Sequence, residues 1–406
     1  MIRIGIIGSG VVGLTLAYEI TNHKPEYEIT IFEKEDSSVR HGTGRNSGVI
    51  HSGIYYTPNS LRSKLCIEGS RLMKKFIEEH NLYLNPCGKL LMPRYLSDLE
   101  SLDFLFERSK EVGVHAIKLN SKEEILKIEP NCNPQFDQAL FIKDTAIGDP
   151  KEVSAKLLEL LSQRKVSILY HHEVSKLASD QGVIYVKDTT FEFDHIINAA
   201  GLYADQIAKI SKLKTNYSSL PFKGKYWSVQ TSNPKELPKT LLYPVPNLAH
   251  PFVGIHTVYD KNGNFYLGPS NTPVFGKEAY KPFQKFKSIE FVNLLFKFIY
   301  KILKNENKLR NLAISEFRNL FISHIKKSTK VYFKNSLDLI LNESPKVGIR
   351  SQIFDNKSKT LFNDFVVIKQ NKTVHILNAI SPAWTSSFAM AKYIYQEFID
   401  QNKKSL

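Results

Sequence analysis

Cysteine is scarce in this 406-residue sequence. Its three cysteines stand far apart, at positions 66, 87 and 132, and no Cys-x-x-Cys pair occurs. This spacing excludes a disulfide scaffold and a cysteine-built zinc site, and it favours a reducing compartment. We therefore expect no metal centre.

A segment that would cross a membrane is also missing. The longest apolar stretch, Ile4 to Ile20, is interrupted by Gly, Ser and Thr residues and contains Glu19, whereas a membrane span takes about 20 predominantly apolar residues. The N-terminus shows no clear basic n-region and no clear small-residue cleavage site, which together mark a secretory signal. We predict a cytoplasmic protein.

The chain does have abundant apolar residues and an excess of positive charge. Hydrophobic residues make up 42% of it and the net charge is +15; residues 277–334 contain 14 Lys or Arg against 4 Glu and no Asp. This size and composition predict a two-domain enzyme with ample core. Basic proteins bind nucleic acid, anionic membranes or acidic small molecules. Because no nucleic-acid motif or basic aromatic platform is present, we expect no nucleic-acid partner.

The first 33 residues carry a dinucleotide-binding pattern. A buried strand at 2–7 is followed by Gly8, Gly10 and Gly13, a helical apolar pattern, and a second strand at 28–32 that ends at Glu33. The glycines allow a tight turn, backbone approach to a pyrophosphate and close helix–strand packing, and the helix N-terminus attracts phosphates. Glu33 is placed to bind ribose hydroxyls, which disfavours NADP, and the adjacent Lys34 is a further cofactor contact. The pattern does not separate NAD from FAD.

The other nucleotide-binding segments lie in the middle and at the end of the chain. Strands are predicted at 166–170 and 365–377, and a terminal helix begins with Ser381 as N-cap and Pro382 in its first turn. We predict an α/β fold in which residues 1–80, 145–215 and 345–406 form the cofactor domain. A β-rich α+β substrate domain, 81–144 and 216–344, is interleaved with it and includes a basic helical segment at 283–330.

Residues 41–56 read His-Gly-Thr-Gly-Arg-Asn-Ser-Gly-Val-Ile-His-Ser-Gly-Ile-Tyr-Tyr. They closely resemble the signature of the L-2-hydroxyglutarate dehydrogenase/oxidase family, which belongs to the D-amino-acid-oxidase-like flavoproteins. The family usually has His in place of Arg45, and tends to have Arg and Glu in place of Lys223 and Lys225. Further segments that resemble the family extend from residue 5 to about 390: 65–69, 87–89, 200–205, 221–224, 243–246, 251–256, 268–269, 347–350 and 378–383.

The resemblance implies a Rossmann-like domain that binds FAD non-covalently. It also implies oxidation of L-2-hydroxyglutarate to 2-oxoglutarate by hydride transfer to flavin N5, and electron delivery to a quinone or to oxygen. An amine or amino-acid oxidase of the glycine or sarcosine type, or another 2-hydroxy-acid dehydrogenase, remains an alternative. A non-enzymatic membrane- or nucleic-acid-binding protein is a third hypothesis, which the distance between the basic stretch and the glycine turn disfavours.

A dicarboxylate substrate needs at least two cationic or strong donor anchors. Arg350 is the first, because the resembling Gly-x-Arg of amino-acid-oxidase relatives holds the substrate carboxylate; otherwise Arg350 is a surface residue in a salt bridge. Lys223 and Lys225 alternate on a predicted strand and so share a face, either toward the distal carboxylate or toward solvent. Tyr243, Tyr55 and Lys89 are further candidates.

His51 and His256 are the candidate bases, since histidine alone titrates near neutral pH unaided. Either of them is otherwise a structural histidine, and the sequence does not decide between the two. The resemblance places Thr43, Arg45, Asn46 and Ser47 against the flavin or its pyrophosphate. The remaining cofactor contacts that it implies are backbone contacts of Val174 with adenine, contacts of Gly201 and Gly348, and the start of the terminal helix at Ser381, Pro382 and Ala383.

Residues 283–305 interleave lysines with dense apolar residues. A basic amphipathic helix of this kind lies on an anionic membrane, where a quinone-coupled dehydrogenase would meet its acceptor. The alternative is a core-packed helix with a solvated lysine face.

Overall fold

The glycine pattern at the N-terminus folds into a β-α-β unit. The computed structural model describes residues 1–246, 253–274, 276–281, 309–319, 321–334, 338–358 and 360–400. In it β1 (Arg3–Ile7) leads through the glycine turn into α1 (Val11–His23), and β2 (Glu28–Phe32) returns parallel to β1. The alternate residues Ile4 and Ile6 of β1 are fully buried.

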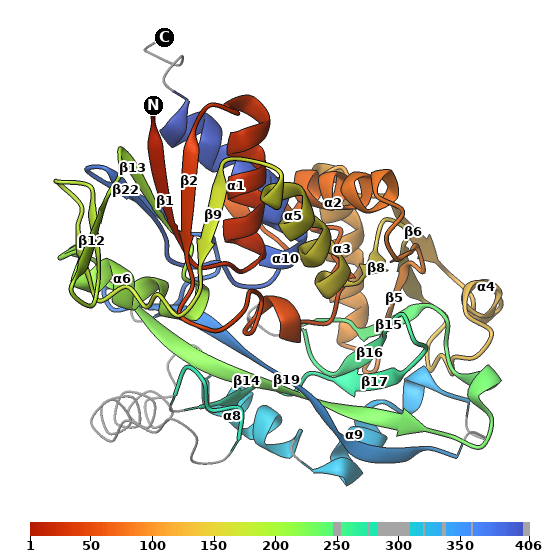
Figure 1. The fold of residues 1–406 in the computed structure, drawn as a ribbon. Helices are drawn as coiled ribbons and strands as arrows, with labels where there is room; N and C mark the ends of the chain where they lie inside the picture. The colour runs from red at the N-terminus through yellow and green to blue at the C-terminus, as the bar shows by residue number, and fades with distance from the viewer. Residues whose placement is uncertain are drawn as a thin grey trace.

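A six-stranded sheet grows from this unit, and Figure 1 shows it at the upper left. Its strand order is β21-β22-β13-β1-β2-β9, parallel except for the edge strand β21. Strands from the first 32 residues, from 166–169 and 195–198, and from 367–376 therefore meet in one sheet. The added strands are β9 (Val166–Leu169), β13 (His195–Asn198), β21 (Val367–Gln370) and β22 (Thr373–Ile376).

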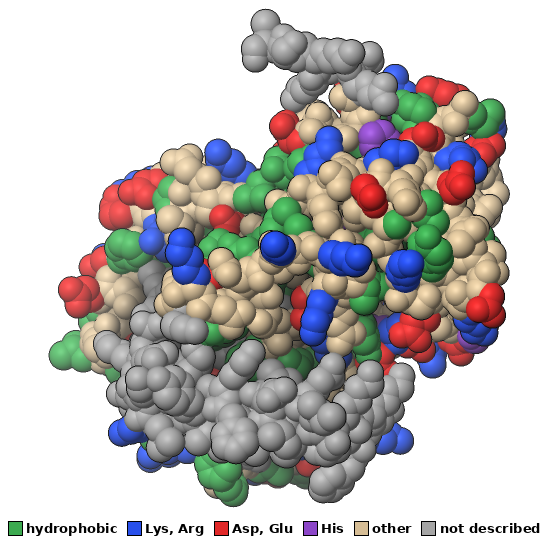
Figure 2. Space-filling view, turned by 90° about the vertical axis from the view of Figure 1, so that its left-hand side faces the viewer, with side chains coloured by type: hydrophobic (Ala, Val, Ile, Leu, Met, Phe, Trp, Pro, Cys, Tyr) green, Lys and Arg blue, Asp and Glu red, His purple; other side chains and the backbone are tan. Residues whose placement is uncertain are grey.

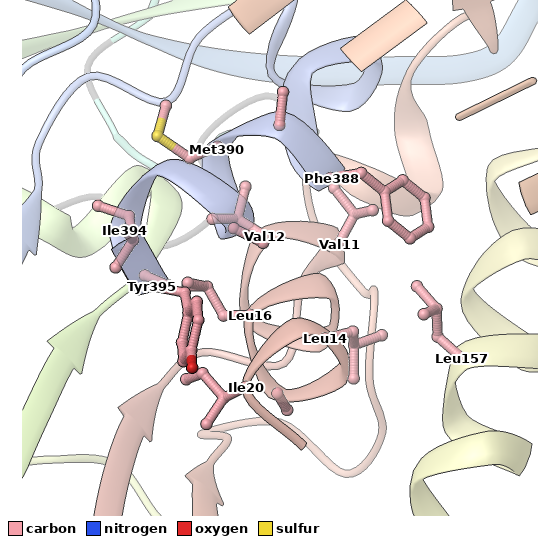
Figure 3. Close-up of a cluster of buried hydrophobic side chains, with 14 of the residues drawn as sticks. Val11, Val12, Leu14, Leu16, Ile20, Leu157, Phe388, Met390, Ile394 and Tyr395 are labelled. Carbon is pink, nitrogen blue, oxygen red and sulfur yellow. The ribbon is translucent and has the colours of Figure 1, made fainter. Parts of the chain in front are cut away.

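Helices cover one face of this sheet and a small antiparallel sheet covers the other. Figure 3 shows how Leu14 of α1 lies near Leu157, while Leu16 and Ile20 lie near Ile394 and Tyr395 at the end of the chain. Fully burying each such side chain stabilises the fold by about 1.5–3 kcal/mol. The helices are α2 (Leu61–Glu79), α5 (Pro150–Ser162), α10 (Ala383–Ile394) and a π-helical turn at Tyr395–Ile399; the other face carries β10 (Lys176–Ala178), β11 (Val183–Val186), β12 (Thr189–Glu192) and α6 (Ala204–Ile210).

The second half of the molecule is built on two long antiparallel strands, β14 (Tyr217–Gln230) and β19 (Ile340–Asp355). In Figure 1 this pair runs beneath both the parallel sheet and the smaller sheets. Its sheet has the order β16-β17-β14-β19-β20, with β18 also on β14. The added strands are β16 (His256–Tyr259), β17 (Phe265–Gly268), β18 (Thr272–Pro273) and β20 (Thr360–Leu361).

Two smaller sheets and four helices complete the described fold. One sheet has the order β15-β5-β7-β6 and the other β3-β8-β4. Their strands are β3 (Val49–Ile50), β4 (Leu84–Asn85), β5 (Lys89–Met92), β6 (Ala116–Leu119), β7 (Ala139–Ile142), β8 (Ala146–Gly148) and β15 (Leu241–Pro244); the helices are α3 (Asp98–Glu111), α4 (Lys122–Ile128), α8 (Leu309–Arg318) and α9 (Ile322–Ser328).

Three sequence-based predictions, on a domain boundary, a helix cap and the basic segment, can be compared with the structure. Residues 345–355, assigned from the sequence to the cofactor domain, pair with β14 as part of β19. The prediction that Ser381 caps the terminal helix is wrong, because the residue before α10 is Pro382 and no side chain caps the helix. Of the predicted basic helical segment at 283–330, residues 283–308 and 320 lie outside the described residues, whereas most of its remainder forms α8 and α9. Within the described residues, no helix combines the length and apolar character needed to cross a membrane.

Candidate active site

A cavity of about 890 Å³ extends from the glycine turn to the strands of the second half of the molecule. Its volume is near the upper end of the range of about 300–1,000 Å³ that is usual for small-molecule and cofactor sites. Eighteen of the predicted site residues line it: Gly8, Gly10, Glu33, Lys34, Thr43, Arg45, Asn46, Ser47, His51, Val174, Gly201, Tyr243, His256, Gly348, Arg350, Ser381, Pro382 and Ala383.

The glycine turn places the N-terminus of α1 at the cavity wall. Gly8 has φ of +106°, and a Cβ atom there would lie 2.7 Å from the carbonyl oxygen of Ala199. Gly13 lies behind the wall, where a Cβ atom would be 2.0 Å from the carbonyl oxygen of Gly8. At Gly10 the nearest atom to such a Cβ is Thr43 Oγ1 at 3.3 Å. The turn therefore depends on Gly8 and Gly13, and it leaves the backbone of Gly10 open to a ligand.

Glu33 holds its carboxylate at the end of β2 through contacts within the protein. Its Oε2 accepts hydrogen bonds from the backbone N–H and the hydroxyl of Ser9, at 3.0 and 2.7 Å, and its Oε1 accepts one from the N–H of Glu35 at 3.0 Å. These bonds fix the orientation of an acceptor that is 9% exposed at the cavity. A carboxylate held in this way can accept hydrogen bonds from ribose hydroxyls.

Lys34, Glu35, His41 and Glu278 form a charged cluster beside Glu33. Glu35, His41 and Glu278 bring metal-ligand atoms within 4.8 Å of one another. The ammonium of Lys34, however, pairs with Glu35 and lies 2.6 Å from Glu278 Oε1. Although burial opposes it, the hydrogen bonds to these carboxylates raise the pKa of Lys34. The cluster is thus a set of ion pairs that already includes a cation.

The predicted flavin loop closes over the start of α1. Thr43 Oγ1 accepts a hydrogen bond from the N–H of Val11 at 3.0 Å, and Asn46 Nδ2 donates to the carbonyl of Thr43 at 2.9 Å. Arg45 lies 3.9 Å from the centroid of the Tyr280 ring and donates to the carbonyl of Val347. The loop is therefore tied both to the helix N-terminus and to β19.

A second part of the cavity gathers Arg350, His51, His256 and Tyr243. Burial lowers the pKa of His256 to about 3, with added effects of the Lys89 and Arg350 charges, although a backbone hydrogen bond to Gly254 opposes the shift. Burial also lowers the pKa of His51 well below its usual range. Both histidines are consequently neutral at physiological pH, beside a guanidinium that stays charged.

The tautomer of His256 follows from its hydrogen bond. Its Nδ1 lies 2.8 Å from the carbonyl oxygen of Gly254, and since a carbonyl can only accept, Nδ1 carries the proton. The lone pair of the neutral ring is then on Nε2. The ring is held by stacking on Tyr243, with centroids 3.8 Å apart. His256 thus presents a fixed proton acceptor, whereas Nδ1 of His51 is buried and has no hydrogen-bond partner within the described part of the chain.

The predicted substrate anchor Lys223 does not line the cavity. Its strand β14 contributes Gly224 and Tyr226 to the wall instead. Lys223 pairs in register with Ile349, one residue away from the Gly224–Gly348 pair, so its side chain points to the opposite face of the sheet. Lys225 shares that opposite face and pairs with Glu343.

Two residues that interact with Arg350 were not found from the sequence: Tyr226, which lines the cavity, and the buried Glu316. Tyr226 is hydrogen-bonded to Ser47 and interacts with the Arg350 charge, while burial raises its pKa to about 12. Glu316 is 7% exposed, accepts from the N–H of Asn271 at 2.7 Å and faces the same Arg350 charge. Strand alternation from Gly224 would have indicated Tyr226, whereas no local signal indicates Glu316.

The family model described as FAD dependent oxidoreductase matches residues 3–397 of this chain. The mitochondrial L-2-hydroxyglutarate dehydrogenase of Caenorhabditis elegans is 31% identical over 98% of this chain and 93% of that protein. The human mitochondrial L-2-hydroxyglutarate dehydrogenase is 30% identical over 97% of this chain and 87% of that protein. The expected resemblance is confirmed.

Solved structures with the same fold include the L-α-glycerophosphate oxidase of Mycoplasma pneumoniae with FAD bound. It superposes with a TM-score of 0.70 at 23% identity, covering 97% of this chain and 94% of that one. Glycine oxidase from Geobacillus kaustophilus gives a TM-score of 0.67 at 16% identity, covering 98% and 94%. The predicted α/β fold is confirmed.

Proposed function

This chain belongs to the family of FAD-dependent oxidoreductases, and we propose that it oxidises L-2-hydroxyglutarate to 2-oxoglutarate. The observation that carries the proposal is the meeting of Arg350 with two neutral histidines, His51 and His256, in one part of the cavity. A cation to hold a carboxylate and a neutral base beside it are what a 2-hydroxy acid requires. The names of the relatives supply the specific acid.

The residues present fit FAD. The open backbone at Gly10 and the N-terminus of α1 suit a pyrophosphate, and the fixed carboxylate of Glu33 suits the adenosine ribose. The start of α10, where Ala383 and Trp384 line the cavity, would place the positive end of the helix dipole toward the flavin ring. When bound, FAD accepts the hydride that leaves C2 of the substrate.

Arg350 anchors the carboxylate next to the reacting carbon. Its planar guanidinium can donate two parallel hydrogen bonds to a carboxylate, which fixes orientation as well as position. Burial lowers its pKa, while Tyr226 and Glu316 oppose that shift. Tyr226 and Glu316 therefore act as positioning residues for the guanidinium.

His256 takes the proton of the substrate hydroxyl. As C2 gives up its hydrogen with the bonding electron pair, the O–H bond breaks, its proton moves to Nε2 of His256, and its electrons form the second bond of the new carbonyl. The carboxylates of the incoming substrate raise the low pKa of His256, since an adjacent negative charge favours the protonated ring. His51 lies within range of the same charges and is the second candidate.

The electrons leave to a quinone or to oxygen, and α8 and α9 offer a surface for contact with an anionic membrane. Ile314, Phe317 and Phe321 are 46%, 61% and 53% exposed, and basic residues such as Arg318 and Lys326 lie among them. Figure 2 shows further Lys and Arg side chains across the middle of one face. Binding to vesicles that contain anionic lipid, but not to neutral vesicles, tests this contact.

The function is tested with the flavin of the purified protein as the probe. Under anaerobic conditions, L-2-hydroxyglutarate should bleach the visible absorbance, whereas its D-isomer, sarcosine and glycerol 3-phosphate should not. Bleaching by one of the other compounds but not by L-2-hydroxyglutarate would overturn the substrate assignment. A protein that takes up no FAD would overturn the cofactor fit.

A further inference from the structure

A buried cation lies at the start of β5, close enough to His51 and His256 for its charge to act on both. Lys89 is 1% exposed, and its Nζ lies 4.2 Å from the centroid of the Tyr55 ring and 5.3 Å from that of Tyr243. No carboxylate among the described residues contributes to its pKa, which burial lowers to about 7. Burial of an ammonium is costly unless an anion pairs with it. Lys89 therefore calls for a counter-ion that the described chain does not provide.

Three polar atoms around Lys89 also lack partners. The hydroxyls of Tyr55 and Tyr243 and Nδ1 of His51 are buried, and none of them has a hydrogen-bond partner among the described residues. Buried side-chain polar atoms in proteins are nearly always hydrogen-bonded. Tyr243 lines the cavity, so a ligand in the cavity can contact Tyr243 next to Lys89. A buried ammonium without a carboxylate partner, next to two tyrosines whose hydroxyls have no acceptor among the described residues, indicates an anionic ligand.

Two cations, Lys89 and Arg350, lie close enough to the histidines to affect them. The charges of both Lys89 and Arg350 act on His51 and on His256. Of the groups around Lys89, His51 and His256 have lowered pKa values, and burial raises those of Cys66, Tyr55 and Tyr243. Lys89 is thus the group of this set that changes charge near neutral pH.

We propose that Lys89, together with the hydroxyls of Tyr55 and Tyr243, forms a second anion subsite that binds the distal carboxylate of a dicarboxylic 2-hydroxy acid. This inference rests on the proposed function, in which Arg350 holds the carboxylate beside the reacting carbon. It assigns to Lys89 the role that the sequence suggested for Lys223. An acid without a second carboxylate leaves the buried ammonium unpaired, so the subsite selects dicarboxylates.

The test compares the binding of two unreactive acids to the FAD-loaded enzyme by isothermal titration calorimetry. Glutarate has both carboxylates of the substrate but no 2-hydroxyl, and butyrate has one carboxylate fewer. The wild-type enzyme should bind glutarate about 10- to 100-fold more tightly than butyrate, as expected for hydrogen bonds to a charged group. Lys89→Met should bind the two acids with nearly equal affinity.

Two further variants make the result specific. Tyr55→Phe keeps the ring next to Lys89 and removes only the hydroxyl. It should therefore weaken the binding of glutarate and leave the binding of butyrate unchanged. Lys118→Met is the matched control, because Lys118 lies on β6 of the same sheet and forms an ion pair with Asp103; it should keep the wild-type preference. The visible flavin spectrum shows that each variant is folded and loaded.

The outcomes separate the subsite from the reaction. If Lys89→Met retains the wild-type preference for glutarate, or loses affinity for both acids equally, the subsite is refuted even where L-2-hydroxyglutarate still reduces the flavin. If L-2-hydroxyglutarate leaves the flavin oxidised while Lys89→Met abolishes a preference for glutarate, the proposed function is wrong and the subsite stands.

Discussion

Replacement of Lys89 by Met should stabilise the protein while it damages the site. Burial lowers the pKa of Lys89 from 10.5 to about 7. At about 1.4 kcal/mol for each pH unit, this difference corresponds to about 5 kcal/mol by which the charged lysine destabilises the folded state. Because the folded pKa lies below the unfolded value, the full cost is present below pH 7 and is lost as the pH rises to 10.5. Met has a similar length and no charge to desolvate.

The assay is the melting temperature of wild-type and Lys89→Met holoenzyme, measured side by side across this pH range. The variant should melt higher at pH values below 7, and the difference should shrink as the pH approaches 10.5. Added glutarate should reduce the difference in melting temperature. A ligand that binds only the folded state stabilises it, and the wild type binds glutarate more tightly than the variant does. Lys118→Met should show no such pH-dependent gain. A variant that melts lower than wild type below pH 7, or a gap independent of pH, would refute the reasoning.

Four other outcomes are expected. Gly13→Ala should purify without flavin, because the new Cβ would lie 2.0 Å from a backbone oxygen of the turn; wild-type flavin absorbance would contradict this. Arg350→Ala should raise KM for L-2-hydroxyglutarate by about 10- to 150-fold through the loss of hydrogen bonds to a charged group, and unchanged steady-state kinetics would remove it from the site. His256→Asn should lower kcat by about 10²- to 10⁴-fold with normal FAD content. His115→Asn, which changes an exposed side chain, should match wild type. An equal loss of kcat in both variants would argue against His256 as the base. Calorimetric affinity for glutarate should fall as the pH rises through about 7, where Lys89 loses its proton, and a flat profile would be inconsistent with its role.

Much of the cofactor side of the cavity was predictable because its signals are local. Gly8, Gly10, Gly13 and Glu33 lie within one β-α-β unit, and their spacing alone predicts that the turn, the helix N-terminus and the carboxylate border one cavity. The cofactor and family predictions are confirmed. The roles of individual residues stay predictions until they are tested.

The substrate side was less predictable because it depends on pairings between distant strands. Alternation along β14 showed that Lys223 and Lys225 share a face, but which face borders the cavity is determined by pairing with β19, more than 100 residues away. Lys89 is buried by Tyr243, on a strand that pairs with β5 in parallel. A buried lysine has no local sequence signature, since lysine is usually exposed.

The most direct measurement of the central claim is the anaerobic reaction of the holoenzyme with L-2-hydroxyglutarate that carries deuterium at C2, followed by stopped-flow absorbance and product analysis. We expect one 2-oxoglutarate to form for each flavin that is bleached, and bleaching to be slower than with the protonated compound because the C2–H bond breaks in that step. A flavin that stays oxidised, or one that is bleached without formation of 2-oxoglutarate, would contradict the account.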